Sequence, residues 1–115
     1  MTKNIDAKDV SETAFCVSSV DGHKLHEVIY QQLSNECKVN ISLAHVRRLT
    51  TAFLNSALGQ LYNEFSYDVV DSYVQFSGGS PQFLSLVDRV RKRAKAYFSA
   101  TTDTVNEIKN TYPDD

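Results

Sequence analysis

The sequence has few of the residues that mark specialised classes of protein. Its 115 residues include two cysteines, four glycines, two prolines and no tryptophan. Two cysteines are too few for the disulfide framework of a small secreted domain, and their spacing is not that of a metal site. We therefore expect Cys16 and Cys37, which both lie in apolar surroundings, to be buried free thiols.

Long apolar runs and an excess of charge of one sign are also missing. Polar or charged residues interrupt every hydrophobic segment, so no segment reaches the length that spans a bilayer. The formal net charge of −2 predicts no general attraction to nucleic acid or to anionic membranes. Residues 1–10 are polar and contain no hydrophobic stretch typical of a signal peptide. We expect a cytoplasmic protein without a membrane partner.

What is present is the composition of an ordinary globular domain, with 42% hydrophobic and 23% charged residues. The clearest pattern is the alternation of Val39, Ile41 and Leu43 with polar residues, which predicts a strand over residues 37–46. Segments rich in β-forming residues predict two further strands. These are residues 13–19 and residues 72–77.

Apolar residues spaced by three or four positions predict three helices. The first begins at Asp21 as its N-cap and buries Leu25, Ile29 and Leu33. The second covers residues 51–64 and has a broad apolar half. The third covers residues 81–98, after a turn of two glycines and a first-turn proline. Its predicted core stripe is Phe83, Val87, Val90, Ala94 and Tyr97.

The order strand, helix, strand, helix, strand, helix predicts one layered α/β domain. We expect a small mixed β-sheet with its helices packed on one face. We divide the chain into an N-terminal strand or tail segment (1–19), a core (20–98) and a helical tail (99–115). The first twelve residues fit either an edge strand or a disordered tail, and the C-terminal tail has only Val105, Ile108 and Tyr112 as apolar anchors.

Two segments together resemble a known family. They are "VNISLAHVRRLTTAFLNSALGQLYNEF" and "VQFSGGSPQFLSLVDRVRKRAKAYF". They resemble the bacterial STAS-like domains. The shared order is a strand, a hydroxyl-rich turn, a Phe-Leu pair that opens a helix with Gly-x-Leu in its middle, a short strand and a helix that starts with Ser-Pro. The resemblance covers residues 20–98 and implies a STAS-like fold.

The resemblance also extends to the anti-sigma factor antagonists of the wider STAS family. Those proteins carry a phosphoacceptor hydroxyl at the start of the helix after the central strand, and they act as partners of kinase-like ATPases. The matching residues here are Thr50 and Thr51. The chain departs from the pattern at Ser42, where an acidic residue is common, and at Ala52, where a third hydroxyl stands. It also lacks the glycine that usually follows the second hydroxyl. The resemblance implies a signalling regulator and no enzymatic activity.

The residues themselves allow two interpretations of the turn that contains Thr50 and Thr51. A hydroxyl at a helix start caps a free backbone N–H. A phosphate at the same place would be stabilised by the helix dipole and by Arg47 and Arg48 just upstream. We predict docking of a protein partner on the turn and on the polar side of the following helix. The residues predicted on that side are Asn55, Ser56, Gly59, Gln60 and Asn63.

Other possible sites have weaker support from their residues. His23, His26 and Glu27 lack the third or fourth ligand that zinc needs, so we expect no metal and no cofactor. No motif of a hydrolase, nucleotide-binding loop or dinucleotide fold occurs, so we expect no catalytic residues. The basic residues of the third helix, Arg91 and Lys95 among them, leave a nucleic-acid-associated regulator as the alternative function. The oligomeric state stays open, with a homodimer as one option.

Overall fold

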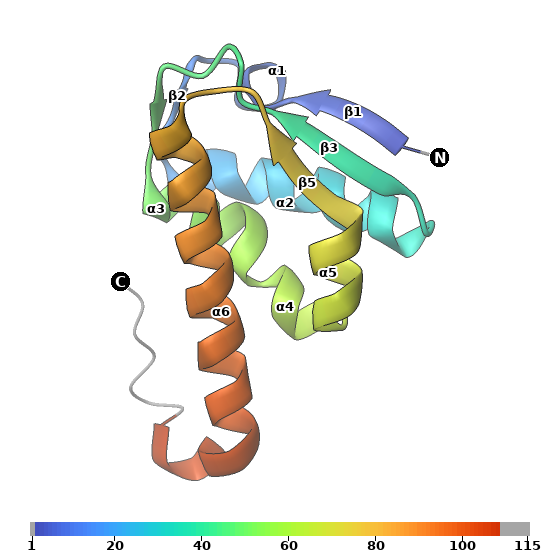
Figure 1. The fold of residues 1–115 in the computed structure, drawn as a ribbon, viewed down its shortest axis with the longest axis vertical. Coiled ribbons are helices and arrows are strands. Elements are labelled where there is room, and N and C mark those ends of the chain that lie inside the picture. Colours follow the sequence, from blue (N-terminus) through green and yellow to red (C-terminus); the bar gives the residue numbers. More distant parts are fainter. Residues whose placement is uncertain (1, 109–115) are drawn as a thin grey trace.

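The computed structural model describes the backbone of residues 2–108 and the side chains of residues 2–99. Figure 1 shows how its strands and helices are arranged. The elements are β1 (Thr2–Asp6), α1 (Ala7–Ser11), β2 (Phe15–Cys16), α2 (Ser19–Ser34), β3 (Lys38–Ser42), β4 (Arg48–Leu49), α3 (Thr51–Leu54), the π-helical turn η1 (Asn55–Gly59), α4 (Leu61–Glu64), α5 (Tyr67–Tyr73), β5 (Val74–Ser77) and α6 (Pro81–Ile108).

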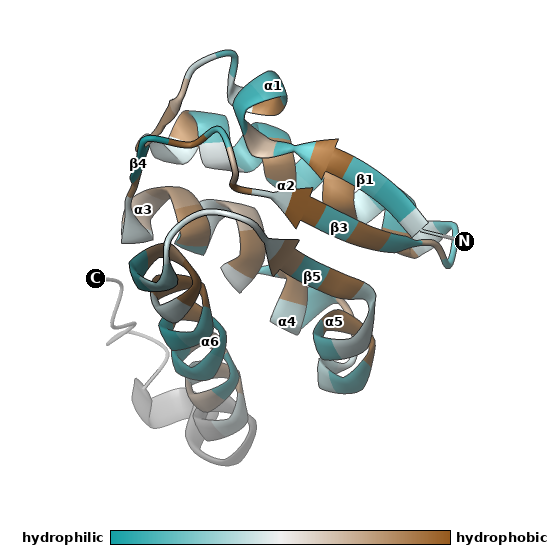
Figure 2. Ribbon diagram, turned by 45° about the horizontal axis from the view of Figure 1, so that its top comes forward, coloured by the Kyte–Doolittle hydropathy of each residue, from teal (hydrophilic) through white to brown (hydrophobic). Residues whose placement is uncertain are grey.

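Three parallel strands form the main sheet, in the order β1-β3-β5. In the central strand, Ile41 lies opposite Ile5 of β1 and Phe76 of β5. Because side chains alternate between the two faces of a sheet, Val39 and Ile41 are buried on the face that packs against α2, whereas Asn40 lies on the polar face. Figure 2 shows the hydrophobic residues gathered along β3 and β5. The predicted α/β fold with a small sheet is confirmed.

The N-terminal segment is an edge strand, one of the two alternatives that its composition left open. Thr2–Asp6 pairs with Lys38–Ser42 in parallel register. The strand ends where Asp6 caps α1: one carboxylate oxygen accepts from the Lys8 amide at 3.0 Å, and the other lies 2.7 Å from Nδ1 of His45. The hydrogen bond with His45 is the main reason that the pKa of Asp6 lies below its ordinary value.

The predicted strand over residues 13–19 is wrong for most of its length. Only Phe15 and Cys16 are strand residues, and they pair with Arg48 and Leu49 of β4 in a separate two-stranded parallel sheet. The chain turns helical early because Ser18, in extended conformation, caps α2 by accepting from the Asp21 amide at 3.1 Å. The N-cap of this helix is therefore Ser18 and not Asp21.

Helix α5 is missing from the sequence prediction, which assigned no element to residues 67–71. Ser66 caps it by accepting from the Val69 amide at 3.2 Å, and Asp68 favours its first turn. The helix runs to Tyr73, so strand β5 begins at Val74 and not at Ser72. A two-turn helix with only Val70 fully buried has too short an apolar stripe to be recognised by periodicity.

The helix predicted over residues 51–64 contains one wide turn. Residues 55–59 form the π-helical turn η1, between α3 and α4. Ala57, Leu58 and Gly59 are consecutive in sequence and all buried, because η1 packs against both α2 and α6. A helical wheel with regular α-helical spacing places Gly59 on the polar side. That placement is wrong, since the extra residue in the turn changes which side chains face inward.

The predicted stripe of α2 is confirmed, since Leu25, Ile29 and Leu33 are buried. The stripe of α6 is confirmed in part: Val87 and Val90 are buried, Phe83 and Ala94 are partly buried against the core, and Tyr97 is not among the core residues. Cys16 is a buried free thiol as predicted, whereas Cys37 is a partly exposed one. Helix α6 continues without a break through Ser99 to Ile108. The predicted apolar anchors Val105, Ile108 and Tyr112 and the closing "PDD" lie outside the part of the chain whose side chains the structure describes.

Helix α2 approaches α3 and η1 most closely at Gly22. A Cβ atom at Gly22 would lie 2.3 Å from the carbonyl oxygen of Phe53 and 2.9 Å from Cβ of Ser56. A Cβ atom at Gly59 would meet nothing within 4 Å. The glycine in α2 therefore has a packing reason that the glycine in η1 lacks.

We predict opposite effects for alanine at the two glycines. Gly22→Ala should lower the free energy of unfolding by about 1–3 kcal/mol, because the new methyl group forces the two helices apart. Gly59→Ala should raise it by about 0.5–1 kcal/mol, because alanine favours helical backbone and has room there. Urea denaturation followed by circular dichroism measures both. Equal losses in the two variants would contradict the close approach at Gly22.

Candidate functional site

The predicted docking turn is held rigidly by its backbone and leaves two cations exposed. The amides of Arg47 and Arg48 both donate to the carbonyl of Ala14, at 2.8 and 3.3 Å, and the amide of Thr50 donates to the carbonyl of Cys16 at 3.2 Å. Both arginine side chains are exposed, and within residues 2–99 neither has an ion-pair partner. Figure 2 shows β4 at one side of the molecule.

An exposed aromatic residue lies beside these arginines. Phe15 of β2 is paired with Arg48 in the two-stranded sheet, and 53% of its surface is exposed. Aromatic and arginine side chains are both enriched in protein interfaces. We call Phe15, Arg47 and Arg48 the β2–β4 surface. The sequence pattern missed Phe15 as a site residue, because it predicted a longer strand there in which Phe15 was one apolar residue among several.

Thr50 is the N-cap of α3, as the capping interpretation predicts. Its Oγ1 accepts from the Phe53 amide at 3.2 Å and donates to the carbonyl of Val17 at 2.8 Å. The hydroxyl therefore joins the start of α3 to the segment that leads into α2. Thr51 is half-buried at the first position of the helix. Phosphate transfer to Thr50 would replace the proton that now bonds to Val17.

The predicted partner-binding face of the second helix is only partly exposed. Ser56 donates to the carbonyl of Ser19 at 2.8 Å, and Asn55 is half-buried. Gly59 is buried. Gln60 and Asn63 are exposed. The exposed part of this face therefore lies toward α4, at a distance in sequence from the Arg47–Thr51 turn.

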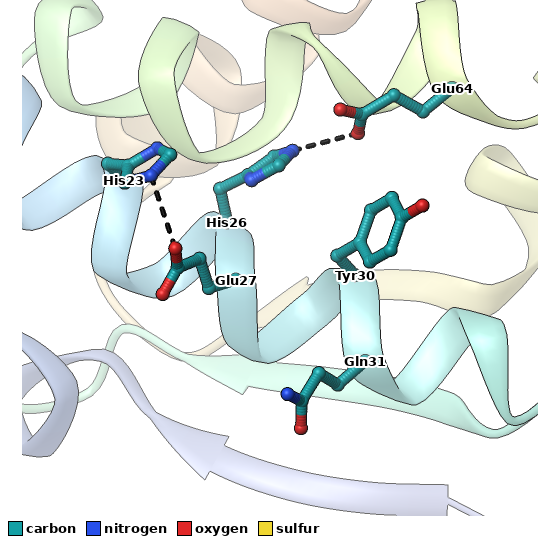
Figure 3. A pocket seen from close by; sticks show the side chains of 6 residues that line it. All are labelled: His23, His26, Glu27, Tyr30, Gln31 and Glu64. Carbon is teal, nitrogen blue, oxygen red and sulfur yellow. Dashed lines mark hydrogen bonds and ion pairs between the residues drawn. The ribbon is translucent and has the colours of Figure 1, made fainter.

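The two histidines of α2 lie beside the end of α4 (Figure 3). Nε2 of His26 is 2.8 Å from Oε1 of Glu64, and Nε2 of His23 is 3.3 Å from Oε2 of Glu27. Within the described part of the chain, no group of three or more histidine, cysteine, aspartate or glutamate side chains could hold a metal ion.

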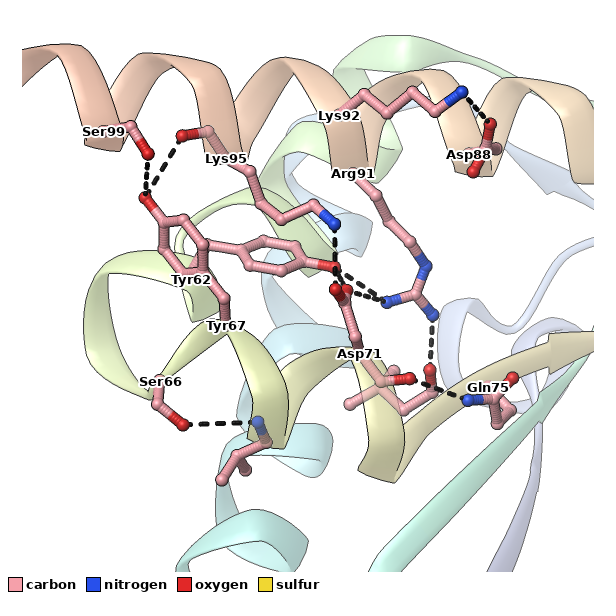
Figure 4. A network of polar contacts seen from close by, with 12 residues as sticks. Tyr62, Ser66, Tyr67, Asp71, Gln75, Asp88, Arg91, Lys92, Lys95 and Ser99 are labelled. Atoms are coloured by element: carbon pink, nitrogen blue, oxygen red, sulfur yellow. Dashed lines mark hydrogen bonds and ion pairs between the residues drawn. The ribbon is translucent and has the colours of Figure 1, made fainter.

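A polar network that the sequence did not reveal joins α4, α5, β5 and α6 (Figure 4). The hydroxyl of Tyr62 donates to Oδ1 of Asp71 at 2.6 Å, and Nζ of Lys95 lies 2.8 Å from the other oxygen. Arg91 donates to the Tyr62 hydroxyl at 2.8 Å and to the carbonyl of Val74. No local pattern marks Asp71 as the partner of two cations on another helix.

The network changes the protonation of its members. Burial raises the pKa of Asp71, but the bonds from Lys95 and Tyr62 outweigh it, and the net pKa lies below the ordinary value of 3.8. Burial and the bond to Asp71 raise the pKa of the Tyr62 hydroxyl. Arg91 and Lys95, the cations on which the nucleic-acid alternative most depended, are thus engaged within the protein.

Comparison with known proteins identifies the family. A family model described as a STAS-like domain of unknown function matches residues 21–82, more than half of the chain. The chain belongs to this STAS-like family. Searches of curated proteins and of solved structures find no match. The resemblance drawn from the sequence is confirmed.

The matched part of the STAS-like domain contains the Arg47–Thr51 turn, η1 and α4, together with the histidines of α2. Phe15 and most of α6 lie outside it. The β2–β4 surface is therefore made partly by residues inside the family match and partly by a residue outside it. None of the helices in the described part of the chain has the length and hydropathy needed to cross a membrane.

We predict that Thr50→Val lowers the free energy of unfolding by about 1–2 kcal/mol, because both the cap to Phe53 and the bond to Val17 are lost. Thr51→Val is the matched control, since its hydroxyl makes no hydrogen bond in the described structure. It should change stability by less than about 0.5 kcal/mol. Chemical denaturation measures both variants. A Thr51→Val loss as large as that of Thr50→Val would contradict this role of Thr50.

We predict that the Asp71 network stabilises the fold at neutral pH and loses its effect in acid. Because the folded pKa of Asp71 is lowered, its contribution is complete above the unfolded pKa of about 3.8 and is lost as pH falls through the folded pKa. Asp71→Asn should cost about 1–2 kcal/mol at pH 7, and the difference from wild type should shrink below about pH 4. Denaturation at a series of pH values tests this. A constant difference between the two proteins from pH 7 to pH 3 would contradict it.

Proposed function

We propose that this STAS-like domain is a non-enzymatic regulatory module that binds another protein through the β2–β4 surface. The observation that carries the proposal is the exposure of Arg47 and Arg48, which have no ion-pair partner among residues 2–99, next to the exposed Phe15, which pairs with Arg48 in the small sheet. Arginine offers planar, forked donors for carboxylates, and an aromatic side chain offers apolar contact at low entropic cost. Such a surface suits an acidic patch on a regulatory partner, of which a kinase-like ATPase is one example.

The proposed regulation acts at Thr50. A phosphate on Oγ1 would remove the proton donated to Val17 and add about two negative charges at pH 7. Those charges would lie in the same turn as Arg47 and Arg48 and would compete with an acidic partner for them. Modification would thus weaken both the junction between α2 and α3 and the attraction of the β2–β4 surface.

The experiment replaces Phe15 by a photo-crosslinking phenylalanine analogue and identifies the protein that is covalently captured in bacterial lysate. The captured protein is then purified, and its affinity for wild type, Arg47→Glu/Arg48→Glu and Lys3→Glu/Arg89→Glu is measured by calorimetry. The last variant reverses the same amount of charge at exposed positions outside the β2–β4 surface.

We expect the arginine variant to bind at least about tenfold more weakly, a loss of about 1.4 kcal/mol, and the control to bind as wild type does. Equal affinity of the arginine variant would refute the β2–β4 surface as the docking site. Thr50→Glu, compared with Thr50→Val, separates the added charge from the lost cap. If only nucleic acid were recovered with the bait, the alternative on α6 would gain support.

A further inference from the structure

The main sheet has two outer edges, and only one of them is covered. At the β5 edge, the guanidinium of Arg91 donates to the carbonyl of Val74 and lies over the ring of Phe76, 5.9 Å from its centroid. At the β1 edge, no hydrogen bond from the rest of residues 2–99 reaches the outward side of the strand. Figures 1 and 2 show β1 with no other described element on its outer side. Strand β1 is therefore an open edge.

The hydrogen bonds of the central strand show which backbone groups of β1 point outward. Along a strand, the N–H and C=O of one residue point to one side, and those of the next residue point to the other. The amide of Leu43 donates to the carbonyl of Ser77 after β5 has paired with β3, at 2.7 Å. Odd-numbered residues of β3 therefore face β5, and even-numbered residues face β1. Asn40 lies opposite Asn4 in the parallel register, so it bonds to the two residues that flank Asn4.

On β1, the backbone groups thus divide into two sets. Those of Lys3 and Ile5 face β3 and are paired in the ladder. Those of Thr2 and Asn4, together with the amide of Asp6, point away from the sheet, and the described residues offer them no partner. A row of unpaired N–H and C=O groups is a template for another strand.

A row of polar side chains crosses the sheet and stops at the same edge. Oγ of Ser77 donates to Oδ1 of Asn40 at 3.1 Å, and Nδ2 of Asn40 donates to Oδ1 of Asn4 at 3.5 Å. Nδ2 of Asn4 has no acceptor among the described residues, and the side chain is exposed. Another side-chain amide matches this end of the row, because it offers both a donor and an acceptor.

A second copy of this chain carries the complementary edge. A twofold axis through Asn4, perpendicular to the sheet, places β1 antiparallel to β1 of the other copy. Asn4 then lies opposite Asn4, where the amide of each donates to the carbonyl of the other. Thr2 lies opposite Asp6, so that the Asp6 amide donates to the Thr2 carbonyl. Each contact is repeated by the symmetry, as a twofold interface requires.

The charges of β1 are compatible with this register. Lys3 of one copy lies opposite Ile5 of the other, and Asp6 lies opposite Thr2. The carboxylate of Asp6 is already held by His45, at 2.7 Å. Like charges directly opposite each other would destabilise the pairing, and this register has none.

We propose that β1 pairs antiparallel with β1 of a second copy across a twofold axis at Asn4, joining the two main sheets into one. An antiparallel strand beside a parallel sheet is a common arrangement. Since β1 has five residues, the interface is at the small end of specific interfaces, and the dimer is weak. The proposal does not depend on the docking of a protein at the β2–β4 surface.

Sedimentation velocity of the full-length protein tests the dimer. Over concentrations from about 10 μM to about 1 mM, which suit a weak interaction, we expect the monomer to convert to a dimer. Amide signals in NMR spectra at the same concentrations should shift along β1 and not along β5, the covered edge. A protein that stays monomeric over this range, or that dimerises with shifts at another surface, would overturn the proposal.

A pair of charge variants tests the twofold axis at Asn4. Asn4→Asp and Asn4→Lys each place like charges opposite each other, so each should dimerise at least about tenfold more weakly than wild type. An equimolar mixture of the two variants places opposite charges there and should regain affinity to within about threefold of wild type. Asn63→Asp and Asn63→Lys, at an exposed asparagine of α4, are the controls and should dimerise as wild type does. A mixture that associates no better than the single variants would refute the axis.

A proline variant tests the backbone pairing separately. Because the Asn4 amide points outward, Asn4→Pro removes a donor from the open edge and leaves the ladder between β1 and β3 in place. It should remain folded by circular dichroism and remain monomeric at every concentration. Asn4→Ala keeps the backbone donor and loses only the side-chain amide, so it should weaken the dimer by a smaller factor. Dimerisation of Asn4→Pro at wild-type affinity would refute the pairing, and if this variant fails to fold, the mixture of charge variants decides the question.

Discussion

The fold depends on one close approach of two backbones, where Gly22 of α2 meets the carbonyl of Phe53. The absence of a side chain at Gly22 lets α2 lie directly on α3 and η1. Hydrogen bonds between these elements can then form on both sides of Gly22. Near the same junction, the bond from Thr50 to Val17 ties the start of α3 to the segment that leads into α2. The bonds that cross it are Thr50 to Val17, Ser56 to Ser19 and His26 to Glu64.

The long helix α6 is attached in a different way. Val87 and Val90 give it a buried apolar contact with the core, and Arg91 and Lys95 add polar contacts to the carboxylate of Asp71. Partly buried charges need partners, and here the cations of one helix and the anion of another satisfy each other. The basic appearance of α6 in the sequence is therefore in part structural in origin, since Arg91 and Lys95 pair with Asp71.

Local contacts explain which parts of the site could be predicted. The Thr50 hydroxyl accepts from the amide three residues further along the chain. This capping contact is local, so sequence alone suffices to recognise it. The helical wheel misplaced Gly59 because it assumes regular α-helical spacing. A π-helical turn changes the direction in which each of its residues points. The contact between His26 of α2 and Glu64 of α4 could not be predicted, because the two residues lie 38 positions apart and no spacing rule connects them.

The sequence by itself determined the family, through its resemblance, and the α/β class, the central strand and the apolar stripe of α2, because these last three depend on periodic patterns over several turns or residues. Only the tertiary structure decided where the short elements begin and end, which glycine is required by packing and which charges are free. Short elements such as β2 and α5 take their form from capping and from neighbours, and a charge is free or paired according to what the folded chain brings beside it. The proposed functions depend on that second kind of information.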